Sequence, residues 1–433
     1  MRVLLPGATG FIGSEIARAL IAAGHEVVGF GRDPALAARL LPGIGWISGD
    51  LRSMASAADW RPKLVGIDAV VNASGTLQSG LRDDVTAVQS RAIRALVDAC
   101  AEAGIGHFVQ ISASDAAIDA ASPFMASKAE ADAHLAVSGL SHTILRPGLV
   151  IGRNAFGGTE LLRVAASLPA TGVVIAGTGG VRCVGMADVV AAVMQALAEP
   201  AGAQGRFDLV EAEARPLGDV IALHRRWLGF APPHWRPRVP LWLLRPVSLM
   251  ADGLGWLGWR SPLRANALGA LVHGVGGDPD QARALLGRDA LSLPEVLAAL
   301  PPAGKADRWQ ARCALVFPLA LASLLLLFVG SGLLGLMRAA QAAQVLEAGG
   351  MARQPAVWLV LAGAVADLGL AALLIWRRSA RAALQGMLAL SLAYVAGSLV
   401  LAPSLWLDPL GPLLKVLPVM ALIGLCLAMV DER

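Results

Sequence analysis

The chain has 433 residues, 56% of them hydrophobic, and its mean hydropathy of +0.61 is higher than a soluble globular protein usually needs. The formal net charge is only +4, and the arginines are scattered instead of forming a long basic run, which argues against nucleic-acid binding. The four cysteines, Cys100, Cys183, Cys313 and Cys426, lack the close Cys or His spacing of a zinc or redox site. We therefore expect reduced thiols, no metal site and two or three domains.

The chain opens with one predicted βαβ unit, with strands at Arg2 to Leu5 and Glu26 to Phe30 around a helix from Phe11 to Ala23. The apolar run before the turn is too short for a signal peptide, so we expect this domain to stay in the cytoplasm. The first strand leads into the glycine turn Gly7-Ala8-Thr9-Gly10-Phe11-Ile12-Gly13. This context predicts a dinucleotide site.

Each glycine of the turn has a physical role in such a site. Gly7 permits a tight turn, Gly10 lets the pyrophosphate approach the backbone, and Gly13 lets the helix and strand pack closely. The N-terminus of the helix then presents N–H groups to phosphate. We expect cofactor contacts from the three glycines and from Thr9, Phe11 and Ile12.

The second strand ends Gly29-Phe30-Gly31-Arg32, where an NAD-binding protein usually has an acidic residue for the ribose hydroxyls. Gly31 and Arg32 favour a 2′-phosphate, and hence NADP(H) over NAD(H). The alternative is an ordinary solvated arginine before a turn at Asp33-Pro34.

With further strand-end motifs, the chain from Met1 to Leu300 resembles the extended and atypical short-chain dehydrogenase/reductase superfamily. Those motifs are Gly49-Asp50-Leu51, Val71-Asn72-Ala73-Ser74-Gly75 and Leu145-Arg146-Pro147-Gly148. The resemblance implies an α/β fold with a Rossmann-type doubly wound parallel sheet. It also implies adenine contacts at Asp50 and Leu51, cofactor contacts at Ala73, Ser74 and Gly75, and a position near the nicotinamide for Pro147.

The superfamily's YxxxK pair stands here as Phe124-Met125-Ala126-Ser127-Lys128, so the tyrosine that handles the proton is missing. The chain's single tyrosine, Tyr394, falls in a predicted membrane helix. Losing a positioned general acid costs about 10² to 10⁴ in rate, which predicts poor turnover of ordinary alcohols or ketones. Hydride transfer to a quinone or flavin stays open.

Three further residues of this site come from the resemblance. Ser112 and Ser114, after a strand from Phe108 to Ile111, match the family's serine region, Ser114 matching the catalytic serine. Lys128 would bind the nicotinamide ribose, with a surface lysine as the alternative. The candidate catalytic residues are therefore Ser114 and Lys128, and Ser112 and Lys128 join the cofactor contacts.

The end of the soluble part and its tryptophans suggest further roles. Ser261-Pro262-Leu263-Arg264 and the stretch from Gly276 to Leu300 resemble the branch related to the 39-kDa subunit of respiratory NADH:ubiquinone oxidoreductase, which holds NADPH and often lacks dehydrogenase activity. Five tryptophans interleave with arginines, a mixture suited to a lipid headgroup interface or to a substrate pocket or core. These are Trp227, Trp235, Trp242, Trp256 and Trp259, with Arg236, Arg238, Arg245 and Arg260.

Four apolar segments follow, each long enough for a bilayer core that needs about 20 residues. They are Cys313 to Met337, Pro355 to Trp376, Ala382 to Leu401 and Gly411 to Val430. Basic residues favour a cytoplasmic location for both termini in the inner (cytoplasmic) membrane. Lys305, Arg308, Arg312, Arg377, Arg378 and Arg381 fall on that side, against Arg338, Arg353 and Lys415 on the other.

The membrane part resembles a DoxX-like four-helix domain in Ala364-Val365-Ala366-Asp367-Leu368-Gly369-Leu370 and in Trp376-Arg377-Arg378. A carboxylate such as Asp367 in a spanning helix is costly unless it faces protein or water. It either carries protons or contacts a quinone headgroup, or it bonds to a neighbouring helix through Gln385, Ser391 or Ser398.

We therefore expect three parts: an NAD(P)-binding Rossmann domain at 1–225, a small substrate or interface subdomain and linker at 226–304, and a DoxX-like domain with four transmembrane helices at 305–433. The leading functional hypothesis is an oxidoreductase at the lipid bilayer that passes reducing equivalents to a quinone or another membrane partner. The alternatives are a non-catalytic NADPH-binding sensor or assembly module, and an isomerase or reductase acting on a lipid-like substrate.

Overall fold

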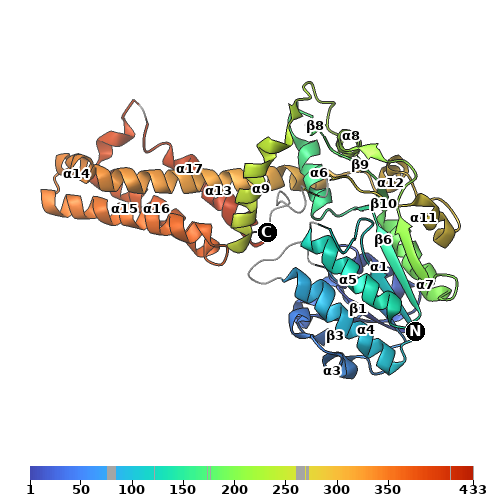
Figure 1. Cartoon of the computed structure of the whole chain (residues 1–433). Helices are drawn as coiled ribbons and strands as arrows, with labels where there is room; N and C mark the ends of the chain where they lie inside the picture. The colour runs from blue at the N-terminus through green and yellow to red at the C-terminus, as the bar shows by residue number, and fades with distance from the viewer. Residues whose placement is uncertain are drawn as a thin grey trace. The chain divides into compact units, whose positions relative to one another are not determined.

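The computed structural model describes residues 1–75, 84–120, 122–172, 174–175, 177–259, 269, 273–409 and 411–432. The chain divides into two compact units, one comprising residues 1–252 and 261–311 and the other residues 253–260 and 312–433 (Figure 1). The predicted motif at 261–264 and Arg260 lie outside the described residues.

A seven-stranded sheet forms the centre of the first unit, with the order β3-β2-β1-β4-β5-β6-β11 and every neighbouring pair parallel. The strands are β1 (Arg2–Pro6), β2 (Glu26–Gly31), β3 (Gly45–Ser48), β4 (Ala69–Asn72), β5 (His107–Ile111), β6 (His142–Pro147) and β11 (Gly205–Leu209). The central strands β4 and β5 are buried along their whole length, as expected for a parallel sheet that is covered on both faces. The predicted Rossmann-type α/β fold is confirmed.

Helices cover both faces of this sheet (Figure 1). One face packs against α1 (Gly13–Ala22), α7 (Met186–Ala198) and α11 (Pro279–Leu286). The other face packs against α3 (Ala57–Trp60), α4 (Ala92–Ala103) and α5 (Pro123–Val137). Because α1 begins directly after the glycine turn, this packing fixes the turn at the carboxyl end of β1.

A smaller subdomain follows β6 in the same unit. It contains the paired strands β7 (Leu149–Ile151) and β10 (Cys183–Gly185), together with α6 (Gly158–Ser167), α8 (Leu217–Trp227) and α12 (Leu293–Ala299), which share a core. The fully buried Glu211 joins these pieces by accepting hydrogen bonds from the Cys183 N–H at 3.0 Å and the Leu293 N–H at 2.8 Å. Because Glu211 lies two residues after β11, these bonds tie the subdomain to the edge strand of the sheet.

Among the described residues, three helices are long and apolar enough to cross a membrane: α13 (Lys305–Met337), α15 (Arg353–Ile375) and α16 (Ala380–Leu401). They confirm the first three predicted apolar segments. The shorter α14 (Ala339–Ala348) connects the first two, and α17 (Val416–Met429) is apolar but has 14 residues. A fourth crossing at α17 therefore stays a prediction.

The five tryptophans of the predicted aromatic and basic stretch separate into two groups. Trp227 packs against the small-subdomain core, and Trp259 lies beside Phe317 in the second unit, with 6.4 Å between ring centroids. Trp235 is 67% exposed, and so are Trp242 (68%) and Trp256 (62%) at the two ends of α9 (Leu241–Trp256). The headgroup hypothesis therefore applies to the second group, and the core alternative to the first.

Candidate functional site

The glycine turn lies at the point where the strand order reverses, between β1 and its neighbours β4 and β2. This is where open parallel sheets bind dinucleotides. Gly7 has φ +84°, and a Cβ atom placed on it would lie 2.5 Å from the Ala73 carbonyl oxygen and 2.6 Å from the Ser74 nitrogen. The turn and the end of β4 are therefore in contact, and only glycine fits between them.

The other two glycines let α1 pack against one side of the turn and leave the other side exposed to solvent. A Cβ on Gly13 would lie 2.1 Å from the Gly7 carbonyl oxygen, so the start of α1 packs directly on the turn. Gly10 donates its N–H to that same oxygen at 2.8 Å, while Gly10 and its neighbour Thr9 are exposed. An exposed glycine backbone before a helix N-terminus fits the pyrophosphate of a dinucleotide.

Phe11 and Ile12 complete the turn but point toward the protein. Both pack against the core of the α1 face, and the Phe11 ring would lie 3.5 Å from a Cβ placed on Gly152, just after β7. The turn is thus in contact with the segment that leads into the small subdomain.

The end of β2 and the residues after β3 come together as predicted for an adenosine-binding edge. Arg32 is exposed, and Asp50 begins the short 3-10 helix Leu51–Ser53. The Arg52 guanidinium, 2.5 Å from an Asp50 carboxylate oxygen, lowers the pKa of Asp50, and Arg32 adds to this effect. The nearby Asp33 accepts a hydrogen bond from the Leu36 N–H and caps the helix at Pro34–Leu40. Two arginines therefore surround the predicted adenine contact.

At the end of β4, a buried amide network holds Ala73, Ser74 and Gly75 in place. The Asn72 side chain donates to the Gln110 side-chain oxygen at 2.8 Å and accepts from the Ser74 backbone N–H at 3.1 Å and from its hydroxyl at 2.5 Å. Gln110 was not expected in the site. Its only sequence signal is a polar residue within a buried strand.

Lys128 lies beside this segment. A Cβ on Gly75 would lie 4.0 Å from the Lys128 Nζ, which donates to the Ile111 carbonyl oxygen at 2.7 Å and lies 5.6 Å from the Phe124 ring centroid. Burial lowers the pKa of Lys128 to about 8, although Asp132 acts to raise it. Lys128 is 6% exposed, so the alternative of a surface lysine is wrong.

Ser112 and Asp132 form a buried pair next to Lys128. The Ser112 hydroxyl donates to one Asp132 oxygen, and the other oxygen has no hydrogen-bond partner among the described residues. Burial raises the pKa of Asp132, while the Ser112 hydrogen bond and Lys128 lower it. Asp132 was not predicted as a site residue. Its signal was its position four residues after Lys128, on the same face of α5.

Ser114 and Pro147 lie at adjacent strand ends. The Ser114 N–H donates to the Pro147 carbonyl oxygen at 3.1 Å, and its hydroxyl lies 3.4 Å from Asp115, which accepts the Gly276 N–H at 3.1 Å. Arg146 donates to the carbonyl oxygens of Ala113, Ser114 and Ala116. Arg146 thus positions the loop that carries Ser114.

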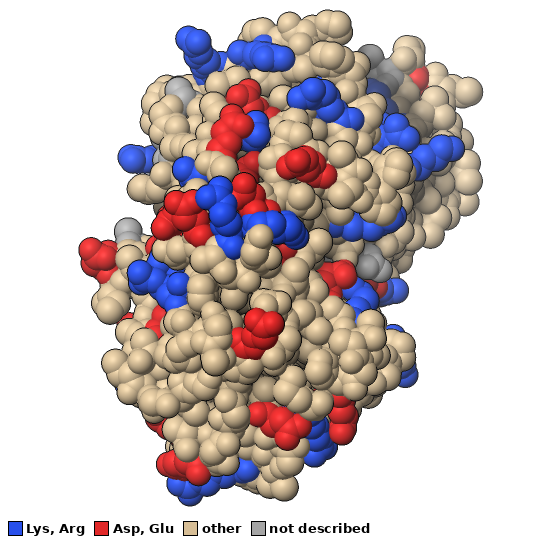
Figure 2. All heavy atoms as spheres, turned by 90° about the vertical axis from the view of Figure 1, so that its right-hand side faces the viewer, with Lys and Arg blue, Asp and Glu red and all other residues tan. Residues whose placement is uncertain are grey.

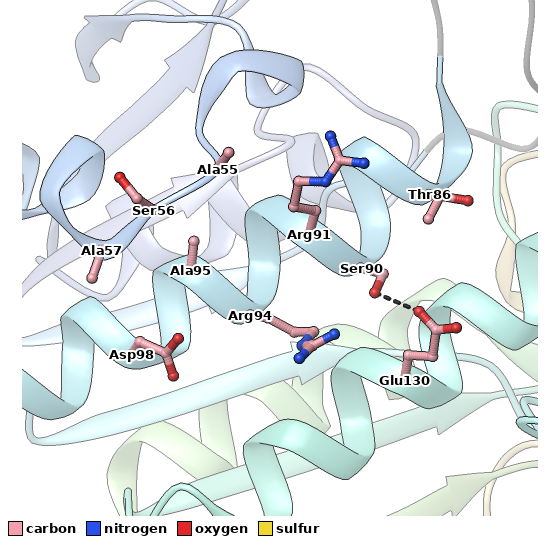
Figure 3. Close-up of a pocket in the computed structure, with 10 residues that line it drawn as sticks. All are labelled: Ala55, Ser56, Ala57, Thr86, Ser90, Arg91, Arg94, Ala95, Asp98 and Glu130. Atoms are coloured by element: carbon pink, nitrogen blue, oxygen red, sulfur yellow. Dashed lines mark hydrogen bonds between the residues drawn. The ribbon is translucent and has the colours of Figure 1, made fainter.

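A groove of about 340 Å³ lies elsewhere on the first unit, where α4 and α5 run side by side (Figure 3). Ser90 donates to Glu130 at 2.6 Å across it, and the groove is also lined by Arg91, the last residue of the π-helix Ala87–Arg91, and by Arg94 of α4. None of the predicted site residues lines this groove. The candidate site therefore lies at the carboxyl ends of the strands. We call it the nucleotide cradle; it comprises the glycine turn, the ends of β2 and β4, and the residues Ser112, Ser114, Lys128, Asp132 and Pro147.

A second cluster of polar side chains lies in the membrane unit. Asp367 on α15 is 3% exposed and accepts hydrogen bonds from the Ser331 hydroxyl on α13 at 2.7 Å and from the Tyr394 hydroxyl on α16 at 3.4 Å. Ser398, a predicted partner, instead donates to the Val395 carbonyl oxygen. Tyr394 shares the helix face of Ser398 and Ser391 because helical neighbours lie three and four residues apart. A bond from Asp367 to neighbouring helices is therefore present, but its partners among the described residues are Ser331 and Tyr394 and not Gln385, Ser391 or Ser398.

The face drawn in Figure 2 carries side chains of both charge signs, blue and red, among a larger tan area. Surface ion pairs of the first unit include Arg2 with Glu26 at 2.9 Å and Arg61 with Glu102 at 2.7 Å.

Two family models match the chain. Residues 7–200 match the model described as NAD(P)H-binding, and residues 325–424 match the DoxX-like family. The first match contains the whole nucleotide cradle, and the second contains both Asp367 and Tyr394.

Curated relatives match parts of the chain, among them the following two. An uncharacterized chloroplastic protein of Arabidopsis thaliana is 30% identical over 169 residues, which are 37% of this chain and 54% of that protein. The chain thus spans about half the length of this relative. Sterol demethylase protein B of Methylococcus capsulatus is 28% identical over 323 residues, covering 66% of this chain and 93% of that protein.

Solved structures with the same fold bind NAD. The UDP-glucose 4-epimerase of Thermus thermophilus in complex with NAD has a TM-score of 0.52 and 22% identity, covering 69% of this chain and 96% of that chain. WbmG of Bordetella bronchiseptica, in complex with NAD and UDP, has a TM-score of 0.53 and 18% identity, covering 72% and 96%. At these identities the similarity shows the fold alone.

Proposed function

Because the chain joins an NAD(P)H-binding domain to a DoxX-like membrane domain, we propose that it is a membrane-anchored NAD(P)H-dependent oxidoreductase whose acceptor is a bilayer-soluble quinone. The observation that carries the proposal is the combination of an intact nucleotide cradle with Phe124 in the position of the family's tyrosine. Reduction of a ketone leaves a strongly basic alkoxide that needs a positioned acid, whereas reduction of a quinone leaves a weakly basic phenolate. A quinone therefore suits a site without that tyrosine.

Within the cradle, we assign each residue a binding or positioning role. The backbone at Gly10 and the start of α1 receive the pyrophosphate, and Lys128 donates to the nicotinamide ribose. Phe124 covers the Lys128 ammonium group and limits its access to water. When bound, the cofactor supplies a hydride, which carries two electrons and one proton, and solvent supplies the second proton of the quinol.

We propose NADP(H) over NAD(H) because Arg32 stands at the end of β2, where NAD-binding proteins usually place a carboxylate. The carboxylate of the adjacent Asp33 is engaged in capping a helix. A guanidinium at this position is suited to bidentate contact with a 2′-phosphate.

Oxidation of NADPH by the full-length protein in detergent, followed by absorbance with a soluble ubiquinone analogue, tests this function. We expect quinone-dependent consumption, and we expect Arg32→Ala to raise KM for NADPH about 10-fold more than KM for NADH, since a charged hydrogen bond contributes about 1.5 to 3 kcal/mol. Arg39→Ala, which removes another exposed arginine a few residues later, is the control. Tight NADPH binding without consumption would refute the reductase and favour a sensor or assembly module.

The same assay in membrane vesicles tests the proposed topology, in which both termini and the nucleotide domain face the cytoplasm and α17 makes the fourth crossing. NADPH does not cross a bilayer, so inverted vesicles should consume it and right-side-out vesicles should not. The opposite result would reverse the orientation.

A second candidate function is reduction or isomerisation of a lipid-like ring compound with the participation of Ser114. The similarity to sterol demethylase protein B, which covers 93% of that protein, supports it. This candidate predicts a defined lipid product, which mass spectrometry of a sterol ketone incubated with protein and NADPH would detect. An unchanged sterol would remove it.

A further inference from the structure

Asp367 is the one charged residue in the first three apolar segments, Cys313 to Met337, Pro355 to Trp376 and Ala382 to Leu401. An ionisable group inside a membrane is expensive and usually marks a ligand or proton site. No lysine, arginine or histidine in these segments can compensate it. Its stabilisation therefore depends on hydroxyl groups.

Three different helices bring these groups together. Ser331 on α13 donates to one Asp367 oxygen at 2.7 Å, and Tyr394 on α16 approaches the other oxygen at 3.4 Å. The first distance is a normal hydrogen bond, whereas the second is near the outer limit. Ser331 thus holds the carboxyl group, and the Tyr394 hydroxyl can turn to another acceptor at little cost.

Tyr394 connects this buried group to the outside of the bundle. Its side chain is 40% exposed, although its hydroxyl lies against a residue that is 3% exposed. The hydroxyl packs against Gly363, one turn before Asp367 on α15, because a glycine has no side chain there: a Cβ placed on it would lie 2.8 Å from the phenolic oxygen. Because the Tyr394 side chain is partly exposed, a molecule dissolved in the bilayer can approach it.

We propose that Ser331, Asp367 and Tyr394 form a binding site for the carbonyl oxygen of a bilayer-soluble ring compound. The Tyr394 hydroxyl donates to that carbonyl, and Asp367 and Ser331 are positioning residues that hold the phenol in place. Identifying the compound as the electron acceptor rests on the proposed function. The shared chemistry is a ring carbonyl, which a quinone or a sterol ketone can supply.

The single tyrosine makes the test specific. Full-length protein labelled with ¹³C at the tyrosine Cζ and placed in lipid nanodiscs has one labelled residue, so its chemical shift reports the Tyr394 hydrogen bond. We expect ubiquinone, a sterol ketone or both to shift this resonance in a saturable manner, while a quinol dimethyl ether without carbonyl groups leaves it unchanged. No shift with either carbonyl compound, or equal shifts with the ether, would overturn the proposal.

Two serine variants test whether the Ser331 hydroxyl positions the site for its ligand or only packs within the helix bundle. Ser331→Ala should weaken binding about 10-fold, the effect expected from losing a hydrogen bond to a charged group. Ser323→Ala is the matched control, because this hydroxyl on the same helix donates to its own helix at the Leu319 carbonyl. Equal affinity in both variants would contradict the positioning role, and circular dichroism would verify that both fold.

The two proposals fail in distinguishable ways. A ligand-dependent shift without NADPH consumption would leave the site intact and refute the reductase. NADPH consumption by a quinone that leaves the tyrosine resonance unchanged would support the reductase and refute this site.

Discussion

The nucleotide cradle and the membrane cluster each bury an ionisable side chain, but they stabilise it differently. Lys128 is 6% exposed and has the Ile111 carbonyl oxygen, the Phe124 ring and the nearby Asp132 around it. Asp367 is 3% exposed, and its recorded partners are two hydroxyl groups. A buried charge with an opposite charge nearby costs less than one without it. The nearby Asp132 therefore favours the charged form of Lys128, although burial opposes it, whereas the membrane cluster suits a group that exchanges partners.

The nucleotide cradle also depends on backbone geometry. Of the substitutions considered, Gly7→Ala should reduce the affinity for NADPH the most. The new Cβ would overlap the Ala73 carbonyl oxygen at 2.5 Å, so the turn must move away from the end of β4. We expect NADPH affinity to fall at least about 100-fold, which corresponds to about 3 kcal/mol. Titration of the full-length protein by NADPH fluorescence measures this effect.

Gly24→Ala is a matched control for the backbone strain. Gly24 has φ +81°, close to the +84° of Gly7, but nothing lies within 4 Å of a Cβ placed on it. Both variants pay about 1 to 2 kcal/mol of stability for the left-handed conformation. If Gly24→Ala lost NADPH as severely as Gly7→Ala, the contact between the turn and β4 would not explain the loss.

Lys128→Met sharpens the comparison of the two buried groups. It removes the ammonium group while keeping a long apolar chain, and we expect the Kd for NADPH to rise about 10- to 100-fold. Because the pKa of Lys128 is about 8, the wild-type lysine loses its proton as pH rises through that value. Wild-type affinity should therefore weaken between about pH 7 and pH 9.

Binding isotherms across this pH range would test that assignment. The variant, which has no proton to lose at this position, should show a flat profile. Lys63→Met is the control, since Lys63 donates to the Asp59 carbonyl oxygen away from the cradle. If the affinity for NADPH changed with pH in the same way in wild type and in Lys128→Met, Lys128 would not be a residue of the cofactor site.

The parts of the fold that sequence predicted well are local ones. The strands around the glycine turn and the turn itself follow from apolar runs of strand length and from glycine spacing within about 30 residues. The observed β1 and β2 extend the predicted strands by one residue each, and α1 begins at Gly13 because the turn occupies Phe11 and Ile12. Three apolar segments were found by length alone.

The side-chain partners could not be predicted because they join distant parts of the chain. Asn72 pairs with Gln110 across β4 and β5, and Ser112 pairs with Asp132 between a strand end and a helix. The partners of Asp367 come from helices 36 residues before it and 27 residues after it. Apolar periodicity identifies which residues share a face, but it does not give the rotation that brings two faces together.

The smallest expected effect concerns α9, whose residues belong to both units. The segment after it is fixed in the membrane unit, because the Arg377 N–H donates to the Leu257 carbonyl oxygen at 3.0 Å and the Trp259 indole donates to the Ile375 carbonyl oxygen at 2.8 Å. These bonds are at the end of α15, where we predict the cytoplasmic headgroups. The exposed apolar side chains of α9 include Trp242 and Leu249, and Arg245 stands between them in the sequence. Such a mixture is typical of a headgroup interface, so we predict that these side chains lie in the headgroup layer.

Quenching of tryptophan fluorescence by brominated lipids in nanodiscs tests this position. Trp242 is one of 11 tryptophans, so Trp242→Phe should remove only a small share of the quenchable emission. Trp227→Phe should remove emission that the lipids do not quench, because Trp227 packs against the small-subdomain core. If the quenched intensity were the same in wild type and Trp242→Phe, this end of α9 would lie in water, and the exposed apolar face would need a different partner.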